Sequence, residues 1–260
     1  MRALVAALVP SLLVLAPSLA ASAPRVILGY ETGPTYIAQN DGRYGETGTP
    51  YEAGDVGQQE TLAVTRRATV ELAHGRHAVV GLYAPLELAT RVRLDQDLQF
   101  RDERFTGGTA VDHRYVFDGF RLSYLYAVLP GAPWRLEAGG SLQVRSALVA
   151  FSSVDGEQYA AQSDIGLVGA FKVRLTYRPD ASWWGQLEAD ALSTFGLLGD
   201  TSGAIYDVAL HAGRAVRPGV DAHVTLRLLG GGAEVPSQAI DNWGNYVSAS
   251  AGLRVELGAL

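Results

Sequence analysis

The sequence contains no cysteine, and all but one of its 21 basic residues are arginines. The lack of cysteine excludes disulfide bonds, a lipid anchor attached to cysteine, and metal sites built on thiolates. Beyond the amino-terminal segment, no stretch approaches the ~20 consecutive apolar residues of a membrane-spanning helix. The formal net charge of −6 argues against a nucleic-acid partner, because such a partner requires a basic surface. Nothing in the composition implies a cofactor.

Residues 1–20 have the form of a secretory signal peptide. Arg2 supplies a positive start, apolar runs cover residues 3–9 and 12–15 with Pro10 between them, and Ala20 ends a small-x-small site for signal peptidase. We therefore expect cleavage after Ala20 and one mature domain over residues 21–260. Cleavage after Ala23 fits the same rule, and an uncleaved membrane anchor is a further alternative that the shortness of the apolar run disfavours.

The stretch from residue 246 to 257 alternates between two kinds of side chain. One parity is apolar and the other polar or charged, as expected for a strand whose successive side chains point to opposite faces. The apolar set is Val247, Ala249, Ala251, Leu253, Val255 and Leu257. The same division recurs in segment after segment behind an export signal, a combination typical of a transmembrane β-barrel in a bacterial outer membrane. A soluble periplasmic, lipocalin-like ligand-binding barrel, with the apolar parity facing inward, is the alternative.

Turn lengths predict the strand count and direction. Four tight turns containing Gly, Pro or Asp lie at residues 73–76, 130–133, 179–181 and 217–219. They alternate with longer polar stretches near residues 41–58, 92–110, 152–162, 197–203 and 232–242. Outer-membrane barrels have short periplasmic turns and longer extracellular loops. The predicted fold is therefore all-β, an up-and-down antiparallel barrel with both termini in the periplasm.

Ten strands follow from these turns, near residues 25–38, 60–72, 77–91, 111–129, 134–150, 163–178, 183–196, 204–217, 219–232 and 243–258. Eight strands is the alternative, because Gly33-Pro34 interrupts the first segment. For residues 77–91 we assign Val80, Leu82, Leu86 and Leu88 to the outward face. An interfacial aromatic girdle is predicted at Tyr126, Trp134, Tyr177 and Trp183 beside the short turns, and at Trp243 on the other rim.

The opposite parity predicts a polar, largely occluded lumen, because the interior of a small barrel is about wide enough for side chains to fill. Charges of both signs alternate there, so ion pairs should satisfy one another. A hairpin centred on Pro179-Asp180 would set Lys172 opposite Glu188 and Arg174 opposite Gln186. The predicted network comprises Arg67, Glu71, Glu87, Arg121, Glu137, Arg145, Lys172, Arg174, Glu188, Asp190, Asp207, His211, Asp221, His223, Arg227, Arg254 and Glu256.

Two histidines could carry chemistry. A hairpin centred on Pro218 pairs His223 with Gly213 and places it diagonal to His211, a grouping able to bind a metal or transfer protons. Histidine–carboxylate pairs are also ordinary components of barrel interiors, so we assign no metal and no catalytic residue. His113 is the histidine expected nearest the external mouth, and no paired Asp or Ser pattern accompanies it.

The chain resembles a group of uncharacterised outer-membrane β-barrel proteins of Gram-negative bacteria. The resemblance rests on residues 75–86, 115–124, 229–234 and 243–246. It implies the same location, with no catalytic residues to carry over. Such proteins usually end on an aromatic residue read by the barrel assembly machinery, whereas this sequence ends in Leu260. We expect either that Leu257 takes over that role or that assembly is less efficient.

The sequence thus predicts an integral outer-membrane, porin-like barrel that is non-enzymatic. Its role would be structural, recognition by loops, or narrow passage of a small solute. Expected partners are outer-membrane lipid, lipopolysaccharide and, during biogenesis, the assembly machinery. External arginines such as Arg93 and Arg104 could meet lipopolysaccharide phosphates. A membrane-embedded hydrolase or acyltransferase acting on lipid A or phospholipid is the alternative from another class.

Overall fold

The computed structural model describes residues 23–59, 61–194 and 201–257. The predicted signal peptide and its cleavage after Ala20 lie outside the described residues. Within them, no helix is long and apolar enough to cross a membrane. The strands are β1 (Arg25–Tyr44), β2 (Leu62–His74), β3 (His77–Tyr83), β4 (Leu86–Arg93), β5 (Leu98–Phe100), β6 (Glu103–Phe105), β7 (Ala110–Leu129), β8 (Trp134–Ser153), β9 (Tyr159–Tyr177), β10 (Trp183–Ser193), β11 (Ser202–Arg217), β12 (Val220–Val235) and β13 (Ile240–Leu257).

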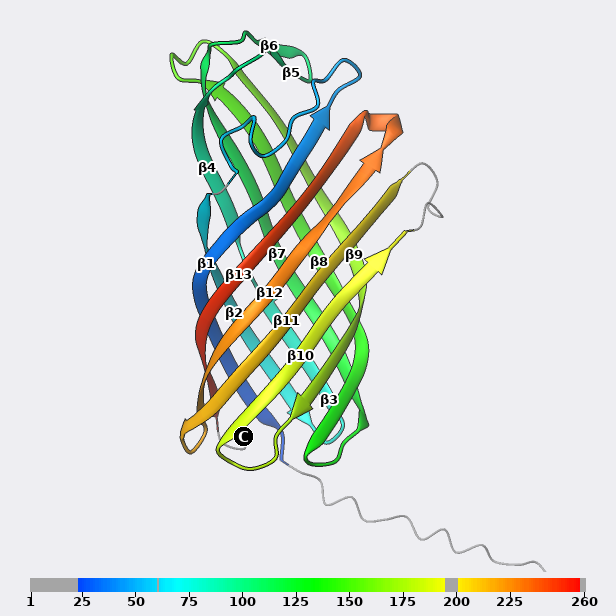
Figure 1. Cartoon of the computed structure of the whole chain (residues 1–260). Coiled ribbons are helices and arrows are strands. Elements are labelled where there is room, and N and C mark those ends of the chain that lie inside the picture. The colour runs from blue at the N-terminus through cyan, green and yellow to red at the C-terminus, as the bar shows by residue number, and fades with distance from the viewer. Residues whose placement is uncertain (1–22, 60, 195–200, 258–260) are drawn as a thin grey trace, which may run out of the picture.

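All strands except β5 and β6 form one closed antiparallel barrel, and β5 and β6 pair in a separate hairpin (Figure 1). The hydrogen-bonded order runs β3-β2-β1-β13-β12-β11-β10-β9-β8-β7, and the pairing of β3 with β7 closes the ring. β3 and β4 both pair with β7 and are separated only by Ala84 and Pro85. They are therefore two segments of one barrel strand. The closed barrel has ten strands, which confirms the predicted fold and count.

The first strand continues through Gly33 and Pro34. Both residues pair with β2, opposite Thr65 and Val64. The ladder with β13 omits these two positions, as expected because proline has no N–H to donate. A Cβ on Gly33 would lie 2.1 Å from the carbonyl oxygen of Ala249, so only glycine allows β13 to approach here.

The strands reach farther at the external end than the sequence suggested. β7 and β8 have 20 residues each and β9 has 19. A tilted strand needs only about 9–11 residues to cross a bilayer. The surplus forms a wall that projects beyond the membrane, while the four short turns gather at the other end, where β1 begins and β13 ends (Figure 1).

The outward face of the barrel is apolar along its lower and middle length. Leu122, Phe120 and Leu167 are each at least 60% exposed on this wall. Nearer the external end the same face becomes charged, with ion pairs between Glu87 and Arg114 and between Arg91 and Asp112. This change from apolar to charged marks the external limit of the lipid-facing surface.

The predicted parity of residues 77–91 was wrong. Leu86 and Leu88 are buried inside the barrel, opposite Phe117 and Tyr115 of β7. Glu87, predicted in the lumen, instead lies on the outer wall with Arg114. Alternation misled here because, at the level of Leu86 and Leu88, the interior is apolar and the outer wall is charged, which reverses the usual pattern of a membrane-spanning strand.

We predict that Leu122→Arg lowers the free energy of unfolding in a bilayer by up to about 2–4 kcal/mol, because the arginine would face hydrocarbon. Ser152→Arg is the matched control, since Ser152 pairs with Asp112 at the charged external level of the wall. Denaturant unfolding in lipid vesicles measures both. Equal losses for the two variants would contradict the assigned membrane limit.

Candidate functional site

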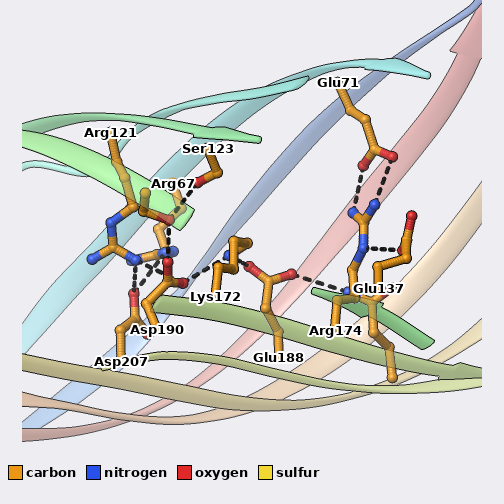
Figure 2. Close-up of polar contacts among 12 residues, drawn as sticks. Arg67, Glu71, Arg121, Ser123, Glu137, Lys172, Arg174, Glu188, Asp190 and Asp207 are labelled. Atoms are coloured by element: carbon orange, nitrogen blue, oxygen red, sulfur yellow. Dashed lines mark hydrogen bonds and ion pairs between the residues drawn. The ribbon is translucent and has the colours of Figure 1, made fainter. Parts of the chain in front are cut away.

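The interior of the barrel contains a network of buried ion pairs centred on Asp207 of β11 (Figure 2). Its carboxylate accepts from Arg67 at 3.2 Å, from Arg121 at 3.0 Å and from Arg227 at 2.5 Å. These arginines come from β2, β7 and β12. Contacts from far sides of the ring thus meet at one carboxylate that is 2% exposed.

Glu31 of β1 extends the network. It lies 3.3 Å from Arg67 and 3.1 Å from Arg227, so two arginines are shared between Glu31 and Asp207. Thr225 donates a further hydrogen bond of 2.8 Å to the Glu31 carboxylate. The charges at this level neutralise one another across the lumen rather than along one strand.

A second cluster lies nearer the periplasmic end. Arg174 donates two hydrogen bonds to Glu71, at 2.7 and 2.9 Å, and one of 2.6 Å to Glu137. This is the two-pronged geometry that suits arginine better than lysine. Arg135 adds a contact of 3.0 Å to Glu137. The cluster ties β2, β8 and β9 together.

The predicted register of β9 and β10 was wrong by two residues. Lys172 pairs with Asp190, and Arg174 with Glu188. The turn is displaced because the Asp180 carboxylate accepts hydrogen bonds from the backbone of Ser182 and Trp183. The Lys172 ammonium nevertheless contacts both Glu188 and Asp190. Loss of Glu188 alone would therefore leave it with a carboxylate partner.

The remaining predicted network residues lie outside these two clusters. Arg145 pairs with Asp164. Asp221 and Glu256 lie near the periplasmic rim, where Asp221 meets Arg178 and Glu256 meets Arg25. Arg254 stacks over the ring of Trp184.

The aromatic residues of the predicted girdle lie as follows. Trp134 and Tyr177 are in contact, with ring centroids 4.4 Å apart, and Trp183 lies 5.7 Å from Tyr177. Tyr126 is beside His77 near the same end. Trp243 is on β13 opposite Asp41, toward the external end.

His211 and His223 lie beside Glu31, and potential ligand atoms of the three residues are all within 4.8 Å of one another. The rings are 5.9 Å apart, and His223 pairs with Gly213. The donor types suit a transition metal. The Glu31 carboxylate is already held by two arginines, however, so a divalent cation would have to enter beside two positive charges.

The external half of the interior is apolar, a feature that the sequence analysis missed. Phe151, Val111 and Val149 of the barrel wall are buried there, together with Val56, Phe100 and Phe105 from the external connections. A smaller group around Ile37, Leu88 and Tyr246 lies between this layer and the charged network. The inward parity of β7 and β8 did contain the signal, in Val111, Tyr115, Phe117, Val149 and Phe151.

Two external segments fold over the mouth, and we call them the cap: residues 45–59 and residues 94–109 (Figure 1). Residues 45–59 lie along the free edge of β4, which pairs only with β7 among the described residues. There Thr90 donates a hydrogen bond to the carbonyl of Val56. The second contains the β5–β6 hairpin. Tyr51 is buried within the cap, and this burial raises the pKa of its hydroxyl well above its ordinary value.

His113 is enclosed by the cap rather than exposed at the mouth. It is 1% exposed, stacks on Phe151 at 4.3 Å and hydrogen-bonds Gln58 at 2.9 Å. Gln58 in turn receives a hydrogen bond from Asn40. These contacts assign His113 to packing of the cap.

No protein-family model matches the sequence, and no curated protein matches it. Among solved structures, the chain is similar to the outer membrane protease OmpT from Escherichia coli, at 12% identity and a TM-score of 0.51. That match covers 93% of this chain and 99% of OmpT. The chain has the fold of an outer-membrane β-barrel. At this identity the likeness concerns the fold alone.

Two further solved structures are also outer-membrane barrels. Ail of Yersinia pestis matches at 11% identity and a TM-score of 0.39, over 88% of this chain and 98% of Ail. Neisserial surface protein A matches at 11% identity and a TM-score of 0.32, over 90% of this chain and 97% of that one.

We predict that Asp207→Asn destabilises the barrel by about 3–5 kcal/mol, because it leaves three buried arginines short of a counter-charge. Glu87→Gln is the control, since its exposed pair with Arg114 should contribute less than about 1 kcal/mol. Guanidinium unfolding in detergent, followed by gel mobility before and after boiling, measures both. An unfolding midpoint unchanged by Asp207→Asn would refute the central role of this carboxylate.

Proposed function

We propose that this protein is an integral outer-membrane barrel that does not conduct and that holds a rigid recognition surface, the cap, outside the cell. The observation that carries the proposal is the filling of the interior. Charged clusters occupy its periplasmic half, and two apolar clusters fill its external half, beside the buried hydrogen bonds from Asn40 through Gln58 to His113. Passage of a polar solute would require both layers to be displaced.

The contents of the charged layer support this proposal over narrow passage of a small solute. The cavity within the network has a volume of only about 90 Å³. Its lining includes Glu31, Arg67 and Arg227, whose charges are already paired with each other. A transported ion would have to replace these contacts one by one.

The construction of the cap supports recognition. Its segments are joined to the barrel by backbone hydrogen bonds, from Arg101 to the carbonyl of Tyr44 and from Gly45 to that of Ala239. A further backbone hydrogen bond joins the two segments to each other, from the N–H of Thr49 to the carbonyl of Gln99. Loops held on a rigid scaffold commonly carry binding function. The charged outer wall below the cap, with Arg91 and Arg114, is the proposed contact with lipopolysaccharide.

Planar-bilayer recording tests the proposal. The inserted wild-type protein should give no discrete conductance steps, because neither layer offers a water-filled path. The insertion control is heat-modifiable gel mobility of protein recovered from the same membranes. Reproducible steps from correctly folded protein would contradict a sealed interior and restore the solute-passage function.

The cap hairpin should keep its order down to acidic pH. Arg104 holds the pKa of the Asp97 carboxyl below its usual range, and the N–H of Gly107 lowers it further. The contribution of Asp97 is therefore fully present above about pH 4, the ordinary aspartate value, and is lost only as the pH falls through the lower folded value.

Hydrogen exchange of the Gly107 amide measures this effect. Protection in wild type should persist at pH 4, whereas Asp97→Ala, which removes the acceptor, should lose it even at neutral pH. Loss of wild-type protection between pH 6 and about pH 4 would contradict the assignment.

A further inference from the structure

A cavity of about 760 Å³ opens at the periplasmic end of the barrel, and we call it the periplasmic cup. The short turns at residues 130–133 and 217–219 form part of its rim. Its inner end is formed by the Arg174 cluster and by Trp184, and the charged and apolar layers lie beyond. The cup is therefore a dead end that admits molecules from the periplasm.

The cup carries an excess of positive charge, although the chain as a whole is acidic. Seven arginines and four carboxylates line it, which leaves an excess of three positive charges. Four of the arginines meet the carboxylates: Arg25 with Glu256, Arg135 with Glu137, Arg174 with Glu71 and Arg178 with Asp221. Arg214, Arg217 and Arg254 form no direct ion pair in the described part of the chain, although Glu71 and Asp221 act on Arg254 from a longer distance.

Arg254 is the most distinctive of these three. Its guanidinium carbon lies 5.0 Å from the centre of the Trp184 ring. That ring is held in a fixed position, since Trp184 is 1% exposed and a Cβ on the facing Gly213 would clash with it at 2.3 Å. A cation stacked on an aromatic face still has its N–H donors free in the plane of the guanidinium.

We propose that the periplasmic cup binds a small, water-soluble oxyanion with several negative charges, held by Arg254 at the floor and by Arg217 at the rim. Guanidinium groups match phosphate and carboxylate oxygens in a two-pronged geometry. The excess of three charges favours a multivalent anion over chloride. The continuous strand wall around the cup favours a soluble ligand over the headgroup of a membrane lipid.

Isothermal titration with inorganic pyrophosphate tests the proposal, using the full chain in a neutral detergent at low ionic strength. We expect one saturable site whose affinity falls as salt is added, because exposed charge–charge attraction is screened. Citrate should displace pyrophosphate from the same site, since it supplies carboxylate oxygens in place of phosphate. Chloride at equal ionic strength should compete far less.

Arg254→Gln should bind pyrophosphate about tenfold more weakly, the effect of losing one charge-assisted contact. Arg43→Gln removes an exposed arginine at the external end of β1, outside the cup, and should bind as wild type does. Arg217→Gln, at the exposed rim, provides a second test if Arg254→Gln fails the gel-mobility test of folding. Absence of saturable binding to wild type in the millimolar range would overturn the proposal. Unchanged binding by both cup variants would overturn it as well.

Discussion

The structure depends on neutralising charges that have been removed from water inside a closed barrel. An isolated buried charge costs several kcal/mol, and the cost is recovered only when its partners lie within hydrogen-bonding distance. Asp207 meets that requirement by taking three arginines from three strands. The positively charged Arg174 meets the same requirement through ion pairs with Glu71 and Glu137. Since a shift of one residue turns every side chain to the opposite face, these contacts strongly favour one register around the ring.

The two halves of the barrel interior differ in the side chains that fill them. The periplasmic half is ionic, with the arginine-rich periplasmic cup at its open end. The external half is packed like the core of a soluble protein, because the cap brings Val56, Phe100 and Phe105 to meet the wall. The break at Ala84-Pro85 makes this arrangement possible: above it, β4 no longer pairs with β2, and residues 45–59 occupy the place of the missing ladder. This division supports the proposed sealed barrel with a rigid outer surface.

The sequence predicted the parts of the fold that depend on local rules. Alternation, short turns rich in Gly, Pro and Asp, and their regular spacing predicted ten antiparallel strands, and the hairpin centred on Pro218 placed His223 opposite Gly213. The sequence-based predictions were wrong where the structure depends on contacts between residues far apart in the chain. Around Leu86 and Leu88 the interior is apolar and the outer wall is charged, so parity assigned the apolar side chains to the wrong face. The β9–β10 register depended on backbone hydrogen bonds accepted by one side chain, Asp180. The cap residues read as polar loops, because nothing local shows that Phe100 and Phe105 would fold inward.

The absence of cysteine makes the sealed interior directly measurable. Ala209 and Ala215 both face inward on β11; Ala209 is 1% exposed among the ion pairs, whereas Ala215 lines the cup. Each can be replaced by cysteine and exposed to a water-soluble maleimide in the folded, membrane-inserted protein. A sealed interior predicts rapid labelling of the Ala215→Cys variant and labelling of the Ala209→Cys variant only after unfolding. Equal labelling rates in folded protein would mean that water reaches the network, and the account of a closed barrel would fail.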